Sequence, residues 1–137
     1  VKDVTDDWPR GWCFIPETIC IANGTSSDKL IDPAHSVAGI RAVDAVNLHA
    51  RQFYGEAVSY ILALPREAEA LRRFCLFPML LAGKTLELAL GNPAVVDTES
   101  VVKVSRSTVT ETIEMVETLL SDDGTLAALT VQGIAEA

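Results

Sequence analysis

Apolar residues recur at intervals of three and four along residues 33–64, 65–90 and 101–120. This spacing is typical of amphipathic helices with one side turned to a core. The first helix is expected to begin at Asp32-Pro33, with Asp as the N-cap and Pro in the first helical position. It should end before Pro65, because a proline disfavours helical backbone at the residue before it. The pattern predicts an all-α chain.

Shorter helices are expected at both ends of the chain. Residues 1–7 are interpreted as the last turns of a helix, which Pro9 and Gly11 break. A short helix should begin at Pro16-Glu17, and a last one should cover residues 125–134. The helix over residues 65–90 should stop at Gly91-Asn92-Pro93, and the one over residues 101–120 before Gly124.

Part of the helix over residues 65–90 is apolar nearly all round, at Phe74, Leu76, Phe77, Met79, Leu80, Leu81 and Ala82. A helix of this kind is central to a bundle or lines an apolar cavity. Pro78 is expected to kink it, and together with Gly83 the kink would leave room for a ligand. Ordinary core packing explains the same pattern, and the pattern alone favours it over a ligand cavity.

Asp3, Asp6 and Asp7 stand at positions i, i+3 and i+4, which share one face of a helix. Three like charges at this spacing repel one another, and a hard divalent cation would relieve the repulsion. Carboxylate oxygens suit Mg²⁺, which takes one or two protein carboxylates together with substrate phosphates. The cluster therefore predicts a Mg²⁺–phosphate site. A solvated acidic helix start is the alternative, since Asp is favourable in a first helical turn.

The composition and net charge of the chain argue against several classes of function. The chain has 137 residues, a net charge of −8 and 49% hydrophobic residues, which is enough for one domain with a sizeable core. The charge argues against a nucleic-acid surface. Three cysteines without a CxxC pair argue against zinc and against a disulfide framework, so a reduced, cytoplasmic setting is expected. No secretory signal or transmembrane run is visible, and the chain begins without Met, which suggests a fragment.

Few other residues stand in a pattern that indicates catalysis, metal binding or ligand binding. His35 and His49 have no metal-ligand spacing, and no serine or threonine is paired with His and Asp in a hydrolase arrangement. Lys103 and Arg106 lie at the start of the expected helix over residues 101–120, where cations oppose the helix dipole. That conflict hints at an anionic partner, and a plain surface role is the alternative.

Four stretches, in order, resemble the C-terminal half of the squalene and phytoene synthase family, and within it the squalene synthase branch. DVTDD at residues 3–7 is similar to the family's second aspartate-rich motif, D-x-x-E-D. Gly11 followed by Phe14-Ile15-Pro16-Glu17 is similar to G-x-x-F-W-P-x-E. Residues 74–86 resemble F-C-x-x-P…A…T-L, and Val102-Lys103-Val104 resembles V-K-I. The likeness covers residues 1–115.

The resemblance implies an all-α isoprenoid-synthase fold. It implies condensation of two farnesyl diphosphates head to head through presqualene diphosphate, with Mg²⁺ at the diphosphate and NADPH reduction to squalene. Carried over by position, Asp3 and Asp7 are the expected Mg²⁺ ligands and catalytic residues, and Asp6 stands on the substrate side where the family has Glu. Phe74 is expected to face the carbocation, with Cys75, Pro78 and Met79 in the cavity wall. Lys103 and Arg106 are the expected cofactor-phosphate contacts.

The sequence departs from the family pattern at several positions. Trp12 stands where Arg is frequent, so a phosphate contact is lost or passes to Arg10. Further departures are Ile15 for Trp, Met79 for Gln and Ser105 for Arg. These changes leave open a dehydrosqualene or phytoene product, and also a non-catalytic module that binds a partner.

The family's first aspartate-rich motif does not occur in these residues. We therefore expect residues 1–137 to form one helical segment, inactive as a synthase by itself, whose partners are farnesyl diphosphate and an N-terminal half of the same fold. A cytoplasmic location at the membrane periphery is expected, because the product is apolar.

Overall fold

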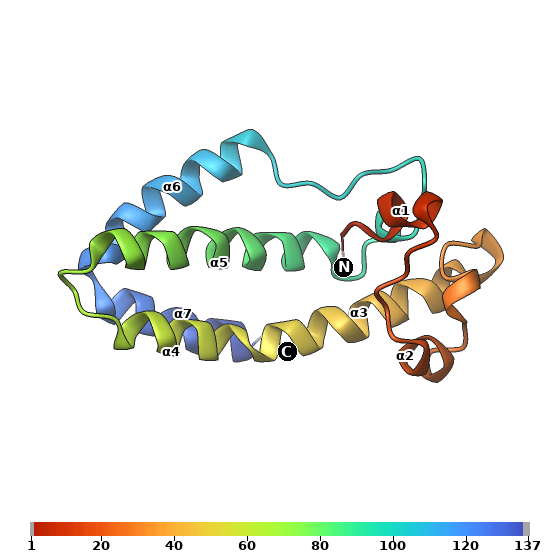
Figure 1. The fold of residues 1–137 in the computed structure, drawn as a ribbon, viewed down its shortest axis with the longest axis horizontal. Coiled ribbons are helices and arrows are strands. Elements are labelled where there is room, and N and C mark those ends of the chain that lie inside the picture. The colour runs from red at the N-terminus through yellow and green to blue at the C-terminus, as the bar shows by residue number, and fades with distance from the viewer. Residues whose placement is uncertain (1, 136–137) are drawn as a thin grey trace. The chain divides into compact units, whose positions relative to one another are not determined.

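The computed structural model describes residues 2–135, and within that range every regular element is a helix (Figure 1). The all-α prediction is confirmed. The chain divides into two compact units, which are described separately. The first unit comprises residues 1–49 and 85–103, and the second comprises residues 50–84 and 104–137. None of the helices in the described range combines the length and apolar character that a membrane crossing requires.

The first unit begins with α1 (Val4–Asp7) and a 3₁₀ turn (Trp8–Arg10), and continues with α2 (Glu17–Ala22). Most of α3 (Ser36–Gln52) and the last turn of α5 (Glu69–Ala89) complete it. Its core contains the buried side chains Ile15, Cys20, Leu30, Ala42, Val43, Ala89, Val95, Val96 and Val102. These residues come from both stretches of the unit, so burial of apolar surface holds the two stretches together.

Two polar contacts join elements of the first unit. The fully buried Asn47 on α3 donates from Nδ2 to the carbonyl oxygen of Leu86 on α5 at 2.8 Å. Where α5 ends, Gly91 adopts a φ of +63°, and its N–H donates to Oδ1 of Asp44 at 2.9 Å. The positive φ explains why glycine ends this helix where the sequence predicted a stop.

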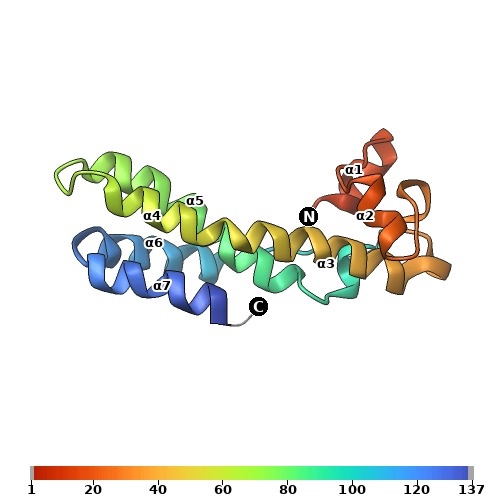
Figure 2. The ribbon, with the colours of Figure 1, turned by 90° about the horizontal axis from the view of Figure 1, so that it is seen from below.

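The second unit contains α4 (Tyr54–Ala63), most of α5, α6 (Arg106–Ser121) and α7 (Asp123–Ala135). In two perpendicular views α4 lies beside α7, and α5 lies beside α6 (Figures 1 and 2). The four helices enclose a core of Val58, Ile61, Leu76, Met79, Leu80, Val116, Leu119, Leu120 and Leu126. On α4, α5 and α6 the buried residues recur at three- and four-residue intervals, as the amphipathic pattern requires, and α7 contributes Leu126.

Several helix boundaries in the structure differ from the predicted ones, each for a local reason. The helix expected over residues 33–64 divides at Phe53, where the backbone N–H bonds to the carbonyl of Ala50, three residues back, in a tightened turn. The helix expected from Pro65 begins at Glu69, after a turn in which the N–H of Ala68 bonds to the carbonyl of Pro65. It then continues without interruption through Pro78.

The third predicted helix begins at Arg106 rather than at residue 101. The Ser105 hydroxyl accepts a hydrogen bond from the N–H of Thr108 at 3.0 Å and caps the helix there. The three valines before it (101, 102 and 104) are β-branched and favour extended backbone. At its other end α6 stops at Ser121, and Gly124 lies inside α7 instead of ending α6.

Candidate functional site

The acidic residues at the start of the chain form one turn of helix. Asp3 is the N-cap of α1, and the backbone N–H of Asp7 donates to its carbonyl oxygen at 2.9 Å. Asp3 and Asp7 are therefore one helical turn apart, on the same side. Val4 and Trp8, also one turn apart, pack against the core of the first unit and fix the inward face of this turn. Asp6 is exposed, whereas Asp3 and Asp7 are half-buried.

Each of the two half-buried carboxylates has a cation beside it. Asp3 forms an ion pair with Lys2, and Nη1 of Arg10 lies 3.2 Å from Oδ1 of Asp7. The Arg10 guanidinium also lies 5.7 Å from the centre of the Trp12 ring, a cation–π arrangement. The repulsion that the sequence suggested is thus relieved within the chain. The bridge from Arg10 was not foreseen, although its place three residues after Asp7 is the signal that could have indicated it.

The donor set of this turn fits a magnesium ion better than a softer metal. It offers carboxylate oxygens and no thiolate or imidazole, and hard cations prefer oxygen. In the described range no group of three or more His, Cys, Asp or Glu side chains is arranged to hold a metal. A site with Asp3 and Asp7 alone therefore suits an ion that keeps several waters and takes its remaining ligands from a phosphate, as Mg²⁺ does.

An apolar groove runs along the second unit between α5 and α6. Its volume is about 680 Å³, and its lining consists of Ala70, Arg73, Phe74, Phe77, Pro78, Ile113, Val116 and Glu117. On α5 these residues recur at i, i+3, i+4, i+7 and i+8, which places them on one face of the helix. Phe74 contributes most to the exposed wall, with 76% of its surface accessible. The groove is thus an apolar surface that is open to solvent at Phe74 and could be covered by an apolar ligand.

One polar bridge crosses the lining of this groove. Nε of Arg73 donates to Oε1 of Glu117 at 2.7 Å, and Nη2 donates to Oε2 at 2.9 Å. These hydrogen bonds hold the pKa of the Glu117 carboxyl below its usual value and raise the pKa of Arg73. Both side chains therefore remain charged, and the bridge is the only ion pair among the residues that line the groove.

The predicted cavity residues divide between two faces of α5. Phe74 and Pro78 line the groove, as expected for a cavity wall. Met79 is buried in the core of the second unit, and the partly buried Cys75 packs against that core, so neither lines the groove. The room expected beside Gly83 is filled, since a Cβ there would lie 3.1 Å from the ring of Tyr54. Ordinary packing, which the sequence pattern favoured over space for a ligand, is therefore found at Gly83.

The family model for squalene/phytoene synthase matches residues 1–108. The chain belongs to the squalene/phytoene synthase family. The family consists of prenyltransferase-type enzymes of isoprenoid synthesis with an all-helical fold, in agreement with the helices described above. Searches among curated proteins and among solved structures gave no match.

The matched region contains the acidic turn, Phe74, Pro78 and Lys103 of this squalene/phytoene synthase family member. Lys103 is exposed and lies outside any helix, whereas Arg106 is the first residue of α6. The expectation that both cations stand at the start of one helix is wrong, because the Ser105 cap sets the helix start after Lys103. The conflict of Lys103 with the helix dipole therefore disappears.

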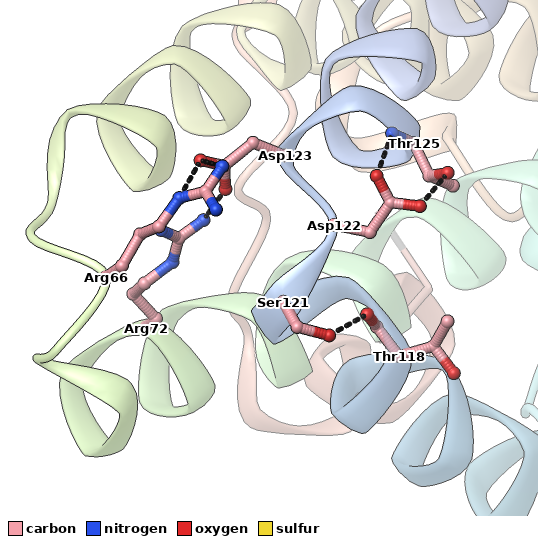
Figure 3. Close-up of polar contacts among 7 residues, drawn as sticks. All are labelled: Arg66, Arg72, Thr118, Ser121, Asp122, Asp123 and Thr125. Carbon is pink, nitrogen blue, oxygen red and sulfur yellow. Dashed lines mark hydrogen bonds and ion pairs between the residues drawn. The ribbon is translucent and has the colours of Figure 1, made fainter.

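A second polar cluster of this family member was not foreseen from the sequence (Figure 3). Arg72 on α5 is fully buried, and its Nη2 is hydrogen-bonded to Oδ1 of Asp123 at the start of α7. Arg66 approaches the same carboxylate, with its Nη2 2.7 Å from Oδ2. The hydrogen bond from Arg72, and then that from Arg66, lower the pKa of Asp123. This cluster ties the beginning of α5 to α7, and residues so far apart in sequence carry no local signal of the pairing.

Proposed function

We propose that this chain is part of a Mg²⁺-dependent prenyltransferase that joins two farnesyl diphosphates head to head. The first product would be presqualene diphosphate, which NADPH then reduces to squalene. The observation that carries the proposal is the pair Asp3 and Asp7, one helical turn apart and half-buried, in a chain that the family matches over residues 1–108. The apolar groove beside Phe74 supports it.

Asp3 and Asp7 are the residues that would hold the metal in this proposal, and the exposed Asp6 would face the substrate side. When bound, Mg²⁺ supplies the positive charge that makes diphosphate a competent leaving group. Arg10 lies between Asp7 and Trp12 and is exposed. Its guanidinium is in position to donate to a phosphate oxygen, and this is how it would replace the arginine that the family pattern has at position 12.

The groove of the second unit, taken by itself, is proposed to bind a prenyl hydrocarbon. A prenyl chain gains free energy when its surface leaves water, and the lining of α5 and α6 is almost wholly apolar. Exclusion of water also protects a carbocation from capture. The ring of Phe74 lines the groove and can stabilise positive charge through its π face. The groove therefore suits a farnesyl chain and the cation formed from it.

Lys103 and Arg106 are the proposed contacts to the phosphates of NADPH, because both are exposed cations. A dehydrosqualene product would follow from the same two farnesyl diphosphates if these residues do not bind the reductant, whereas a phytoene product would require two geranylgeranyl diphosphates instead. A non-catalytic binding module is the second candidate function. It is favoured by one observation, that Asp3 and Asp7 already have Lys2 and Arg10 as partners and so need no metal to balance their charge.

Residues 1–137 contain one of the two acidic motifs that clamp a diphosphate in the family. We therefore propose that this chain binds the substrate without turning it over, and that it acts with a segment carrying the other motif. Its proposed location is cytoplasmic, at the membrane periphery, where a product as apolar as squalene can leave. Detection of presqualene diphosphate, squalene or dehydrosqualene from this chain, farnesyl diphosphate, Mg²⁺ and NADPH would contradict the proposed inactivity.

The proposal is tested by calorimetric titration with farnesyl thiodiphosphate, with and without Mg²⁺. We expect binding that requires the metal and is lost in the Asp3→Asn/Asp7→Asn variant. The matched control, Asp28→Asn/Asp97→Asn, removes the same charge from exposed carboxylates elsewhere in the first unit and should bind as the wild type does. Binding that survives without Mg²⁺, or that both double variants weaken equally, would contradict the assigned site. No binding at all by a folded chain would favour the non-catalytic module.

A further inference from the structure

The groove between α5 and α6 lies wholly within the second unit and combines an apolar lining with one polar pair. Six of its eight lining side chains are apolar, among them Phe74, Phe77 and Ile113. Arg73 and Glu117 are the two charged ones, and hydrogen bonds of 2.7 and 2.9 Å join them to each other. A ligand that fills this groove is therefore expected to be apolar apart from one polar group.

The two charged side chains keep hydrogen-bonding capacity that their bridge does not use. A guanidinium has five N–H donors, and the bridge engages Nε and Nη2 of Arg73, so the donors of Nη1 take no part in it. Each carboxylate oxygen of Glu117 accepts one of these hydrogen bonds and has a lone pair left for another donor. The two side chains are 43% and 53% exposed, so part of this polar surface is open to solvent. A ligand that covers it must offer hydrogen bonds in place of those to water.

The charges around the pair favour a neutral polar group over an ion. Glu117, through its hydrogen bonds, and Glu69, one turn earlier on α5, both raise the pKa of Arg73, so negative charge already surrounds this guanidinium and opposes a second anion. A cationic group at Glu117 would in turn be repelled by Arg73. A hydroxyl brings no charge, and it can accept from Arg73 while it donates to Glu117. Hydrogen bonds to charged groups are also stronger than those between neutral groups.

We propose that the groove binds an apolar chain that ends in a hydroxyl, a prenyl or alkyl alcohol, with the hydroxyl on the Arg73–Glu117 pair and the hydrocarbon along the apolar lining. Binding at this site is non-covalent, and neither residue is catalytic. The site goes beyond the proposed function, because it needs neither a metal nor the acidic turn with Asp3 and Asp7.

The experiment is a calorimetric titration without metal, with geraniol and with its methyl ether. The two probes share one hydrocarbon chain, but the ether oxygen can only accept, whereas the alcohol can also donate to Glu117. In Glu117→Leu the ratio of the alcohol affinity to the ether affinity should fall about threefold to tenfold, the loss expected for one hydrogen bond. The double variant Arg73→Leu/Glu117→Leu should show a similar fall. The matched control is Glu114→Leu, which removes an exposed carboxylate of α6 that does not line the groove and should retain the wild-type ratio.

The outcomes separate this inference from the proposed function. An unchanged ratio in either Glu117 variant, with the helical circular dichroism intact, would overturn the alcohol site, and so would the absence of geraniol binding by the folded wild type. Tighter binding of geranylamine than of geraniol would also overturn it, because the pair would then act as a carboxylate site for a cation. Geraniol should bind equally well to Asp3→Asn/Asp7→Asn, the variant that is expected to lose farnesyl thiodiphosphate. Either site can therefore fail while the other stands.

Discussion

Gly39 on α3 permits the closest approach of two backbone segments in the first unit. A Cβ added there would lie 2.3 Å from the carbonyl oxygen of Leu30 and 3.2 Å from Cγ1 of Val96. Leu30 is fully buried, and the obstacle is backbone, so it cannot turn aside as a side chain can. Overpacking of a core costs about 1–3 kcal/mol, and this contact belongs at the upper end. Alanine in a helix regains about 1 kcal/mol over glycine. Gly39→Ala should therefore destabilise the protein by about 1–2 kcal/mol.

Gly83 provides the matched control, because it too lies within a helix and gains the same propensity as alanine. Its added Cβ would meet the ring of Tyr54 at 3.1 Å, a side chain that can shift by a few tenths of an ångström. The free energy of unfolding of Gly83→Ala, measured by urea denaturation, should lie within about 1 kcal/mol of the wild type. A Gly39→Ala protein as stable as the wild type, or a larger loss in Gly83→Ala, would refute the reasoning.

Four further predictions concern polar contacts. Asp123→Asn should lower the midpoint of urea unfolding strongly, because it leaves the buried Arg72 without its charged partner. The double variant Arg72→Met/Asp123→Asn should recover part of that loss, since no buried charge is then left unpaired. An equal fall of the midpoint in the single and the double variant would contradict this. The hydrogen bonds from Arg72 and Arg66 lower the pKa of Asp123 from 3.8. The stability that Asp123 contributes should therefore be complete above pH 3.8 and be lost as the pH falls through the lowered pKa, which a pH series of urea titrations would detect. Asn47→Ala should cost about 1 kcal/mol in the same assay, because the hydrogen bond from Nδ2 to the carbonyl of Leu86 is lost while that carbonyl still accepts from the N–H of Leu90, and an unchanged stability would contradict this. Ser105→Ala should cost about 1 kcal/mol and shorten α6 at its start, visible as faster amide exchange at Thr108.

The helical class and the acidic turn were accessible from local sequence. The period of apolar residues marks α3, α4, α5 and α6, and the N-cap at Asp32 is seen in the hydrogen bond from the N–H of Ala34 to its side chain at 2.9 Å. The spacing of Asp3 and Asp7 predicted that they share one side of a helical turn, and their backbone hydrogen bond confirms it.

The remaining features depend on tertiary contacts that a linear pattern does not record. A run of apolar residues over 74–82 does not indicate which side of α5 faces a groove and which faces a core, so the burial of Met79 in the core could not be predicted from it. The space beside Gly83 depends on Tyr54 from another helix. The start of α6 was misjudged because valines fit both a helical and an extended pattern, and the cap at Ser105 decided between them.

The central claim is that Asp3 and Asp7 hold a divalent cation together with a diphosphate. Paramagnetic broadening of amide NMR signals by Mn²⁺, added with farnesyl thiodiphosphate, tests it most directly. The account predicts broadening concentrated at residues 2–12, dependent on the diphosphate and abolished in Asp3→Asn/Asp7→Asn. Broadening that centres on another acidic stretch, such as Asp97 and Glu99, or that persists in the double variant, would contradict the account.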